Sequence, residues 1–349
     1  MIRAFRLDNN GFSATRAAAH VAVAAVLIII ALLLEGAEAM ACGWLLCFAF
    51  IAGIPVGSLV LLMIHRLTGG AWGFALAPFL RPAALCIPVL AIAFVPLAVA
   101  THALYPWTSA ATAAHLYLNV PTFIARAAIA VIGWSVLGVI FGGKGGAPLV
   151  AALGLAFYGL TISLVSIDWF LSMDPHYAST AFGATIAIQQ ILTALAAAAL
   201  FAPGELRERD LGDLSGLLIA ALLGVVYLAL MTLIVQWYGN LPDRAHWYLL
   251  RSQNGWAFVI GAGAILALAG FAMLLLLRIR QSRIGVRLAG AVILTAIIVH
   301  LCWLIVPAYS SQARVIVAAL LCFIAMVLVC LPLAAGTRGA LQQASQHAR

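Results

Sequence analysis

The chain has 349 residues, of which 66% are hydrophobic and only 8% are charged, and its mean hydropathy is +1.15. This composition excludes an ordinary soluble domain, in which about a quarter of the residues are charged. The formal net charge of +8 comes from basic residues that are spread over short segments between long apolar runs. Such a distribution is set by membrane topology, so we expect no nucleic-acid partner.

Apolar runs long enough to cross a bilayer, roughly 17 to 25 residues each, recur about ten times. In chain order, we predict transmembrane helices near residues 17–34, 41–65, 82–103, 121–142, 149–171, 180–201, 214–237, 257–277, 288–307 and 315–332. Strands are not expected, because open strands leave backbone groups unpaired in lipid and the alternating pattern of a porin is absent. The predicted fold class is an all-α membrane protein of about ten transmembrane helices. Residues 1–16 form a cytoplasmic segment, 17–335 the transmembrane domain and 336–349 a short cytoplasmic tail.

The orientation is predicted from the basic residues, because short cytoplasmic loops retain positive charge. Most of the 18 basic residues fall on one side of the predicted spans, whereas Arg244, Arg251 and Arg314 fall on the other side. Both termini are therefore predicted to be cytoplasmic. The stretch Ala37-Glu38-Ala39 resembles a signal cleavage site, and cleavage there would leave nine spans. The preceding run is long for a signal peptide, so we keep it as the first span.

The cysteines and histidines do not predict a redox centre within this chain. The six cysteines lie in or beside apolar spans and form no Cys-x-x-Cys pair, whereas iron–sulfur clusters need clustered thiolates. His102 and His300 are predicted at similar depth toward the outer side, where such a pair could ligate haem between facing helices. The alternative is that each histidine forms hydrogen bonds in a polar pocket. We predict no metal site.

Polar residues gather at the predicted outer ends of several spans, and Asp168 is the most informative of them. A carboxylate inside an apolar span costs several kcal/mol and usually marks a proton, ion or cofactor site. The other polar or aromatic residues at this level are His102, Arg126, Gln189, Gln190, Gln236, His300 and Trp303. We predict a cavity lined by His102, Asp168, Gln236 and His300.

Each of these residues also has a structural interpretation. Arg126 is either a site residue or an anchor that extends to the interface. Asp168 needs a partner, which Arg126 or a histidine could supply, or it could instead form a helix cap or a helix–helix hydrogen bond. Asp174 precedes Pro175 and therefore resembles a turn, with His176 at the interface. The predicted catalytic residues are Asp168, His300 and Arg126, and the predicted binding residues are His102, Gln236, Trp303, Asp174 and His176.

A faint internal repeat suggests how the helices are arranged. The fifth and ninth predicted spans end with Trp169, Pro175 and Tyr177 and with Trp303, Pro307 and Tyr309, respectively. We therefore predict two parallel four-helix units, made of spans two to five and six to nine, with the first and tenth spans outside them.

Five stretches resemble a known family of membrane subunits. These stretches are Pro55–Trp72, Leu104–Trp107, Tyr117–Pro121, Ser166–Thr180 and Tyr238–Tyr248. In this order they resemble the NrfD-like, polysulfide-reductase anchor type of integral membrane subunit, most closely the second such subunit of bacterial alternative complex III.

The resemblance implies a subunit of a quinol:cytochrome c or oxidase-linked oxidoreductase in the bacterial inner membrane. Its implied role is a quinone-binding cavity, a proton path near the periplasmic face, or both. Quinone or quinol is the implied ligand, and no cofactor is bound covalently. The implied partners are a sister NrfD-like subunit, an iron–sulfur subunit, multihaem cytochrome c subunits and membrane lipid, with the haem and iron–sulfur clusters in those subunits.

Two other functions remain open from the sequence. An ion-coupled secondary transporter also buries carboxylates and arginine among about ten helices. The polar cluster, however, is predicted nearer the outer surface than the midplane, and only Gly53 with Pro55 interrupts a span. The other alternative is a purely structural anchor of the same complex.

Overall fold

The computed structural model describes residues 14–109, 116–143, 145–174, 177–201, 206–239, 242–309 and 312–347. Within these ranges every regular element is a helix, and no strand is present. The longer helices are α1 (Ala14–Glu35), α2 (Ala37–Thr68), α3 (Ala71–Ala84), α4 (Ile87–Val99), α6 (Val120–Gly142), α7 (Pro148–Trp169), α8 (Phe182–Phe201), α9 (Glu208–Gly239), α11 (Trp256–Leu275), α13 (Arg283–Ile305) and α14 (Gln312–His347). The short helices are α5 (Thr101–Leu104), η2 (Pro106–Thr108), η3 (Leu171–Met173), α10 (Pro242–Leu250), α12 (Leu277–Arg280) and η4 (Val306–Ala308).

The described part of the chain contains eight helices that are long and apolar enough to cross a membrane. They are α2, α6, α7, α8, α9, α11, α13 and α14, and the α3–α4 pair makes a ninth if it is counted as one span. In α1 the described apolar portion is Ala19–Glu35, which is shorter than the other eight. The prediction of an all-helical, multi-pass membrane protein is thus confirmed, while the count of ten remains a prediction.

The third predicted span differs from the structure at its start. The sequence suggested one helix from residue 82, but the chain is already helical in α3 from Ala71, and α4 follows at an angle of 41°. Pro88 stands in the first turn of α4 and has no N–H to donate to the carbonyl of Ala84. This missing hydrogen bond accounts for the break between the two helices.

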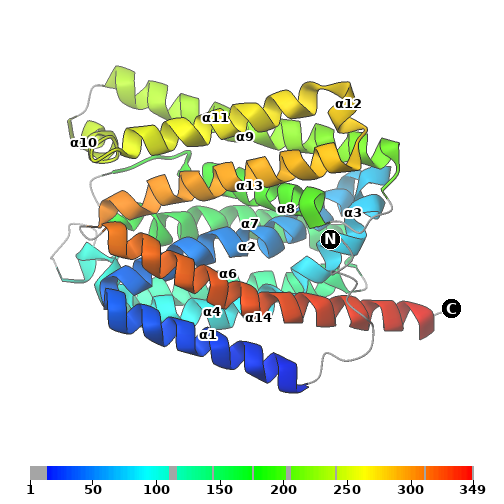
Figure 1. The fold of residues 1–349 in the computed structure, drawn as a ribbon, viewed down its shortest axis with the longest axis horizontal. Coiled ribbons are helices and arrows are strands. Elements are labelled where there is room, and N and C mark those ends of the chain that lie inside the picture. The colour runs from blue at the N-terminus through cyan, green and yellow to red at the C-terminus, as the bar shows by residue number, and fades with distance from the viewer. Residues whose placement is uncertain are drawn as a thin grey trace.

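Helix α2 is the centre of the bundle, and Figure 1 shows it surrounded by other helices. It contacts α3, α4, α6, α7, α8, α13 and α14, and 83% of its apolar 18-residue stretch is buried inside the protein. In α9 and α11 only 17% of the corresponding stretch is buried. Those two helices therefore present most of their apolar surface to the outside of the bundle, as expected in lipid.

The helix contacts form two closed groups. Around the first group, α2 contacts α4, α4 contacts α6, α6 contacts α7, and α7 contacts α2. Around the second group, α8 contacts α9, α9 contacts α11, α11 contacts α13, and α13 contacts α8. The groups meet through α2 and α8, while α1 packs against α14.

Candidate functional site

A buried ion pair joins α6 to α7 near one end of the bundle. The Arg126 Nε lies 2.7 Å from Asp168 Oδ2, and its Nη2 lies 2.9 Å from Asp168 Oδ1. The side chain of Asp168 is 1% exposed and that of Arg126 is 15% exposed. This bidentate geometry is the strongest form of carboxylate–guanidinium contact. Arg126 is therefore the partner of Asp168 and not only an anchor at the membrane interface.

The turn before α6 fixes the position of Arg126. The Asn119 side chain accepts a hydrogen bond from the backbone N–H of Thr122, which caps the start of the helix. Arg126 Nη2 also donates to the Tyr117 carbonyl at 3.1 Å, and its guanidinium lies 3.9 Å from the centre of the Tyr117 ring. Burial, and then the Asp168 charge, raise the pKa of Tyr117 to about 12, so this hydroxyl stays protonated at neutral pH.

Tyr105 connects this pair to the neighbouring surface. Its hydroxyl donates to the backbone carbonyl of Trp169, the residue after Asp168, at 3.2 Å. Burial, and secondarily the Asp168 charge, raise the pKa of Tyr105 well above its usual value. Tyr105 therefore acts as a neutral hydrogen-bond donor beside the ion pair.

An open pocket of about 160 Å³ lies on the other side of Tyr105. Its lining includes Glu38 at the start of α2 and His102 in α5, together with Tyr105, Ser109 and Tyr309. His102 is one of the binding residues predicted from the sequence, whereas Glu38 was expected only as part of a possible cleavage site. The signal for Glu38 was present, because it is an acid at the outer end of a predicted span, at the same level as His102.

The remaining predicted site residues do not share that pocket. His300 lies in α13 with its ring 6.0 Å from the ring of Trp303, and Gln236 is a buried residue of α9. Asp168, Gln236 and His300 line neither of the two cavities described here. The expected common cavity was inferred from depth alone, but residues at one depth can face different helices. Asp174 follows η3, whereas His176 lies outside the described residues.

A second buried arginine, which sequence reasoning assigned only to an outer loop, lies in the other helix group. Arg251 is 2% exposed, and its Nε and Nη2 donate to the Leu304 carbonyl at 3.2 and 3.0 Å. Its guanidinium lies 3.9 Å from the centre of the Trp247 ring, and its own carbonyl accepts from the Trp303 indole at 3.0 Å. Arg251 thus caps the carboxyl end of α13, where carbonyls lack helical partners.

Aromatic rings surround this second arginine. Tyr177 stacks on Trp247 with ring centres 4.4 Å apart, and Trp247 meets Trp303 edge-on at 5.3 Å. Burial lowers the pKa of Arg251 to about 10, against the opposing effect of the Asp174 charge, so Arg251 is still a cation at neutral pH. The cluster fixes α10 and the segment before α8 against the end of α13.

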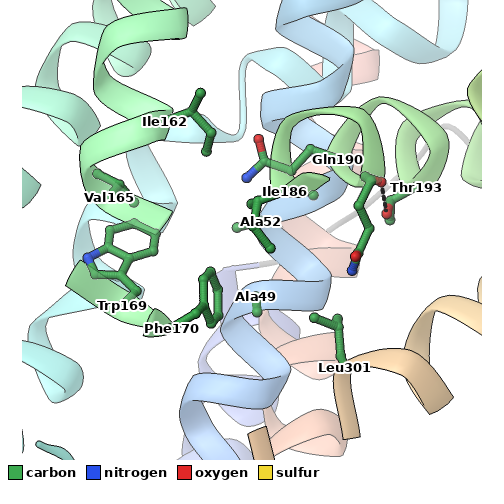
Figure 2. Close-up of a pocket in the computed structure, with 12 residues that line it drawn as sticks. Ala49, Ala52, Ile162, Val165, Trp169, Phe170, Ile186, Gln190, Thr193 and Leu301 are labelled. Atoms are coloured by element: carbon green, nitrogen blue, oxygen red, sulfur yellow. Dashed lines mark hydrogen bonds between the residues drawn. The ribbon is translucent and has the colours of Figure 1, made fainter. Parts of the chain in front are cut away.

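A second, smaller cavity of about 20 Å³ lies in the middle of the bundle (Figure 2). Most of its lining is apolar and comes from Ala49 and Ala52 of α2, Ile162 and Val165 of α7, and Leu301 of α13. Its polar lining residues include Gln189, Gln190 and Thr193 on α8.

Among the described residues, no group of three or more His, Cys, Asp or Glu side chains could hold a metal ion. The described cysteines are all free. No family model matches the sequence, and no curated protein is significantly similar to it. The resemblance to NrfD-like subunits therefore remains a prediction.

Proposed function

We propose that this chain is a membrane subunit of a quinol-oxidising respiratory complex and contributes a quinol pocket, a proton path, or both. The observation that carries the proposal is the pocket that His102 and Glu38 line beside Tyr105. Oxidation of a quinol releases two protons, and imidazole and carboxylate groups are suited to accept them. Electrons would pass to haem and iron–sulfur clusters in partner subunits.

The size of the pocket sets what it could hold. At about 160 Å³ it is smaller than the roughly 300 Å³ at which complete ligand sites begin. We therefore propose that it receives the hydroxyl-bearing edge of a quinol and that a partner subunit completes the wall. Asp168 and Arg126 form the charged pair behind Tyr105. We assign no role in quinol binding or proton transfer to His300, Gln236 or Trp303.

We also propose ten spans, arranged as two parallel four-helix units with α1 and α14 outside them. The two closed contact groups and the packing of α1 on α14 support this arrangement. The proposed location is the bacterial inner membrane, with both termini cytoplasmic and the pocket at the periplasmic face. The uneven distribution of basic residues supports this orientation.

A purely structural anchor is the second candidate function. It is favoured by the ion pair, because both carboxylate oxygens of Asp168 are engaged by Arg126. Contact with the guanidinium favours the ionised form of the Asp168 carboxylate, and a carboxylate whose two oxygens are both engaged in this way is a poor proton carrier.

The first test identifies the polypeptides that co-purify with this chain after gentle detergent extraction. We expect it to co-purify with multihaem cytochrome c, iron–sulfur and sister membrane polypeptides. A chain that purifies alone and accumulates a substrate in liposomes would exclude the redox proposal and favour a transporter.

The second test is quinol oxidation by the assembled complex carrying His102→Gln or Glu38→Gln. Each variant removes one proton acceptor from the pocket, so we expect turnover to fall by about tenfold or more while assembly is unchanged. His246→Gln is the matched control, because His246 is exposed in α10 and does not line the pocket. Unchanged turnover in both pocket variants would leave the anchor function as the better explanation.

A further inference from the structure

We infer that the corner made by α12 and the first turns of α13, residues 275–288, binds an anionic phospholipid. Its headgroup lies on the arginines of this basic corner, and its acyl chains follow an exposed face of α13. The corner is at the opposite end of α13 from the pocket, whose lining includes Ala308 and Tyr309 just beyond that helix. Figure 1 shows α12 at this end of the bundle, next to α11 and α13. The inference does not depend on the proposed redox role.

Positive charge is concentrated at the basic corner. Residues 275–288 include no acidic residue and four arginines, which are Arg278, Arg280, Arg283 and Arg287. Helix α12 packs against α9, α11 and α13, and of these helices only α9 carries acidic residues, which are Glu208, Asp210 and Asp213. Arg280 faces α9, since its Nη2 donates to the Gly212 carbonyl at 3.2 Å. Arg278 and Arg287 are exposed, and neither forms an ion pair with an acidic residue in the described part of the chain.

Close packing of α12 on α13 holds these arginines at one place. A Cβ atom on Gly285 would lie 2.7 Å from the carbonyl oxygen of Ile279, so the two helices touch at the first turn of α13. Arg283 and Arg287 are four residues apart and share a face of α13, where like charges repel each other. The start of α13 adds the positive end of its helix dipole. A phosphate bound at the corner offsets this repulsion.

Exposed apolar side chains adjoin the arginines. Ile284 is 71% exposed and Leu288 is 54% exposed. Together with Ala291 and Thr295 they have the spacing of one helical face, which runs from the basic corner toward the middle of α13. At the end of α11 and the start of α12, between 57% and 65% of each of three further side chains is exposed, namely Leu275, Leu276 and Leu277.

The combination of these two surfaces selects the ligand. Guanidinium groups form charge-assisted hydrogen bonds with phosphate, and basic residues at a membrane surface attract anionic lipids. Free phosphate would match the arginines but leave the apolar face uncovered. A zwitterionic lipid would cover that face but bring no net negative charge. An anionic phospholipid matches both surfaces.

Native mass spectrometry of the full chain, titrated in detergent with phosphatidylglycerol, tests the inference. We expect phosphatidylglycerol to bind about tenfold or more tightly than phosphatidylcholine with the same acyl chains. Glycerol 3-phosphate, which carries the phosphate without acyl chains, should not displace the lipid at equal concentration. Equal affinity for the two lipids, or displacement by glycerol 3-phosphate, would overturn the inference, whether or not any variant folds.

A pair of double variants then locates the site. Arg278→Gln with Arg287→Gln should lower the affinity for phosphatidylglycerol about twentyfold, because each arginine contributes about fivefold. Arg66→Gln with Arg81→Gln is the matched control, since both arginines are exposed on the same predicted side of the membrane and lie outside the corner. We expect the control to bind the lipid like the unaltered chain. An equal loss in the two double variants would show a general attraction to positive charge and contradict the site.

Discussion

Asp168 and Arg126 show how two charges are accommodated inside an apolar bundle. Burying a lone carboxylate is costly, and the cost is offset only when a partner makes close, well-aligned hydrogen bonds. Here the partner lies 42 residues earlier in the chain and bonds both carboxylate oxygens. The Tyr117 ring covers the guanidinium and so fixes its direction.

We predict that Asp168→Ala and Arg126→Ala each lower the free energy of unfolding by about 3 kcal/mol, because each leaves one buried charge without its partner. The double variant is expected to lose less than the sum of the two, since it removes both charges. Chemical unfolding in detergent, followed by tryptophan fluorescence, measures these differences. Additive losses would show that the two charges do not interact energetically.

Arg251 solves a related problem by a different contact. No carboxylate forms an ion pair with it in the described part of the chain, and its donors bond the Leu304 and Trp247 carbonyls instead. In both helix groups an arginine lies over an aromatic ring near the carboxyl end of a core helix, α7 or α13. Among the described residues, only Arg126 in the α7 group forms a close ion pair at that point, whereas Arg251 feels the charge of Asp174 without such a pair.

Among the helices, the junction of α2 and α8 depends on glycine. A Cβ atom on Gly57 would overlap the backbone carbonyl oxygen of Gln190. A Cβ atom on Gly43 would likewise overlap the backbone of Ala319 in α14. Small residues at such crossings let helix backbones approach closely, which is a main source of packing energy in membrane bundles.

We predict that Gly57→Ala destabilises the protein by about 1–3 kcal/mol, because α8 must move away from α2. Gly159→Ala in α7 is the control, since nothing lies within 4 Å of the Cβ it would add. The control is expected to be neutral or slightly stabilising, as alanine favours helix by about 0.5–1 kcal/mol. Thermal unfolding of both variants in the same detergent makes the comparison, and equal midpoints would contradict the close approach.

For the whole molecule, the distribution of charge predicts which end faces the cytoplasm. Ser282, beside Arg278, Arg280 and Arg283, lies at one end, and Ser252 lies in the turn before α11 at the other. We expect Ser252→Cys to react with a membrane-impermeant thiol reagent on intact cells and Ser282→Cys to react only after permeabilisation. The described native cysteines are buried or half-buried, so they give a low background. The reverse pattern would invert the proposed orientation.

A related accessibility experiment tests the number of spans. Tags on the two termini lie on the same side of the membrane if the chain has ten spans and on opposite sides if it has nine. We expect both tags to be protected in intact cells. One protected and one accessible tag would show that either α1 or the α3–α4 pair does not cross the bilayer.

The amino-acid sequence was sufficient for the membrane character and the helical class, because a backbone in lipid must satisfy its own hydrogen bonds and long apolar runs leave only the helix. It also predicted that Asp168 has a partner inside the bundle, since a carboxylate in such a run is costly to bury alone. The tertiary structure decided that this partner is Arg126 and that Glu38 and His102 line one pocket, because both depend on how the helices face one another. Depth can be read along a single helix, but the direction of a side chain is set by packing against neighbours that are distant in the chain.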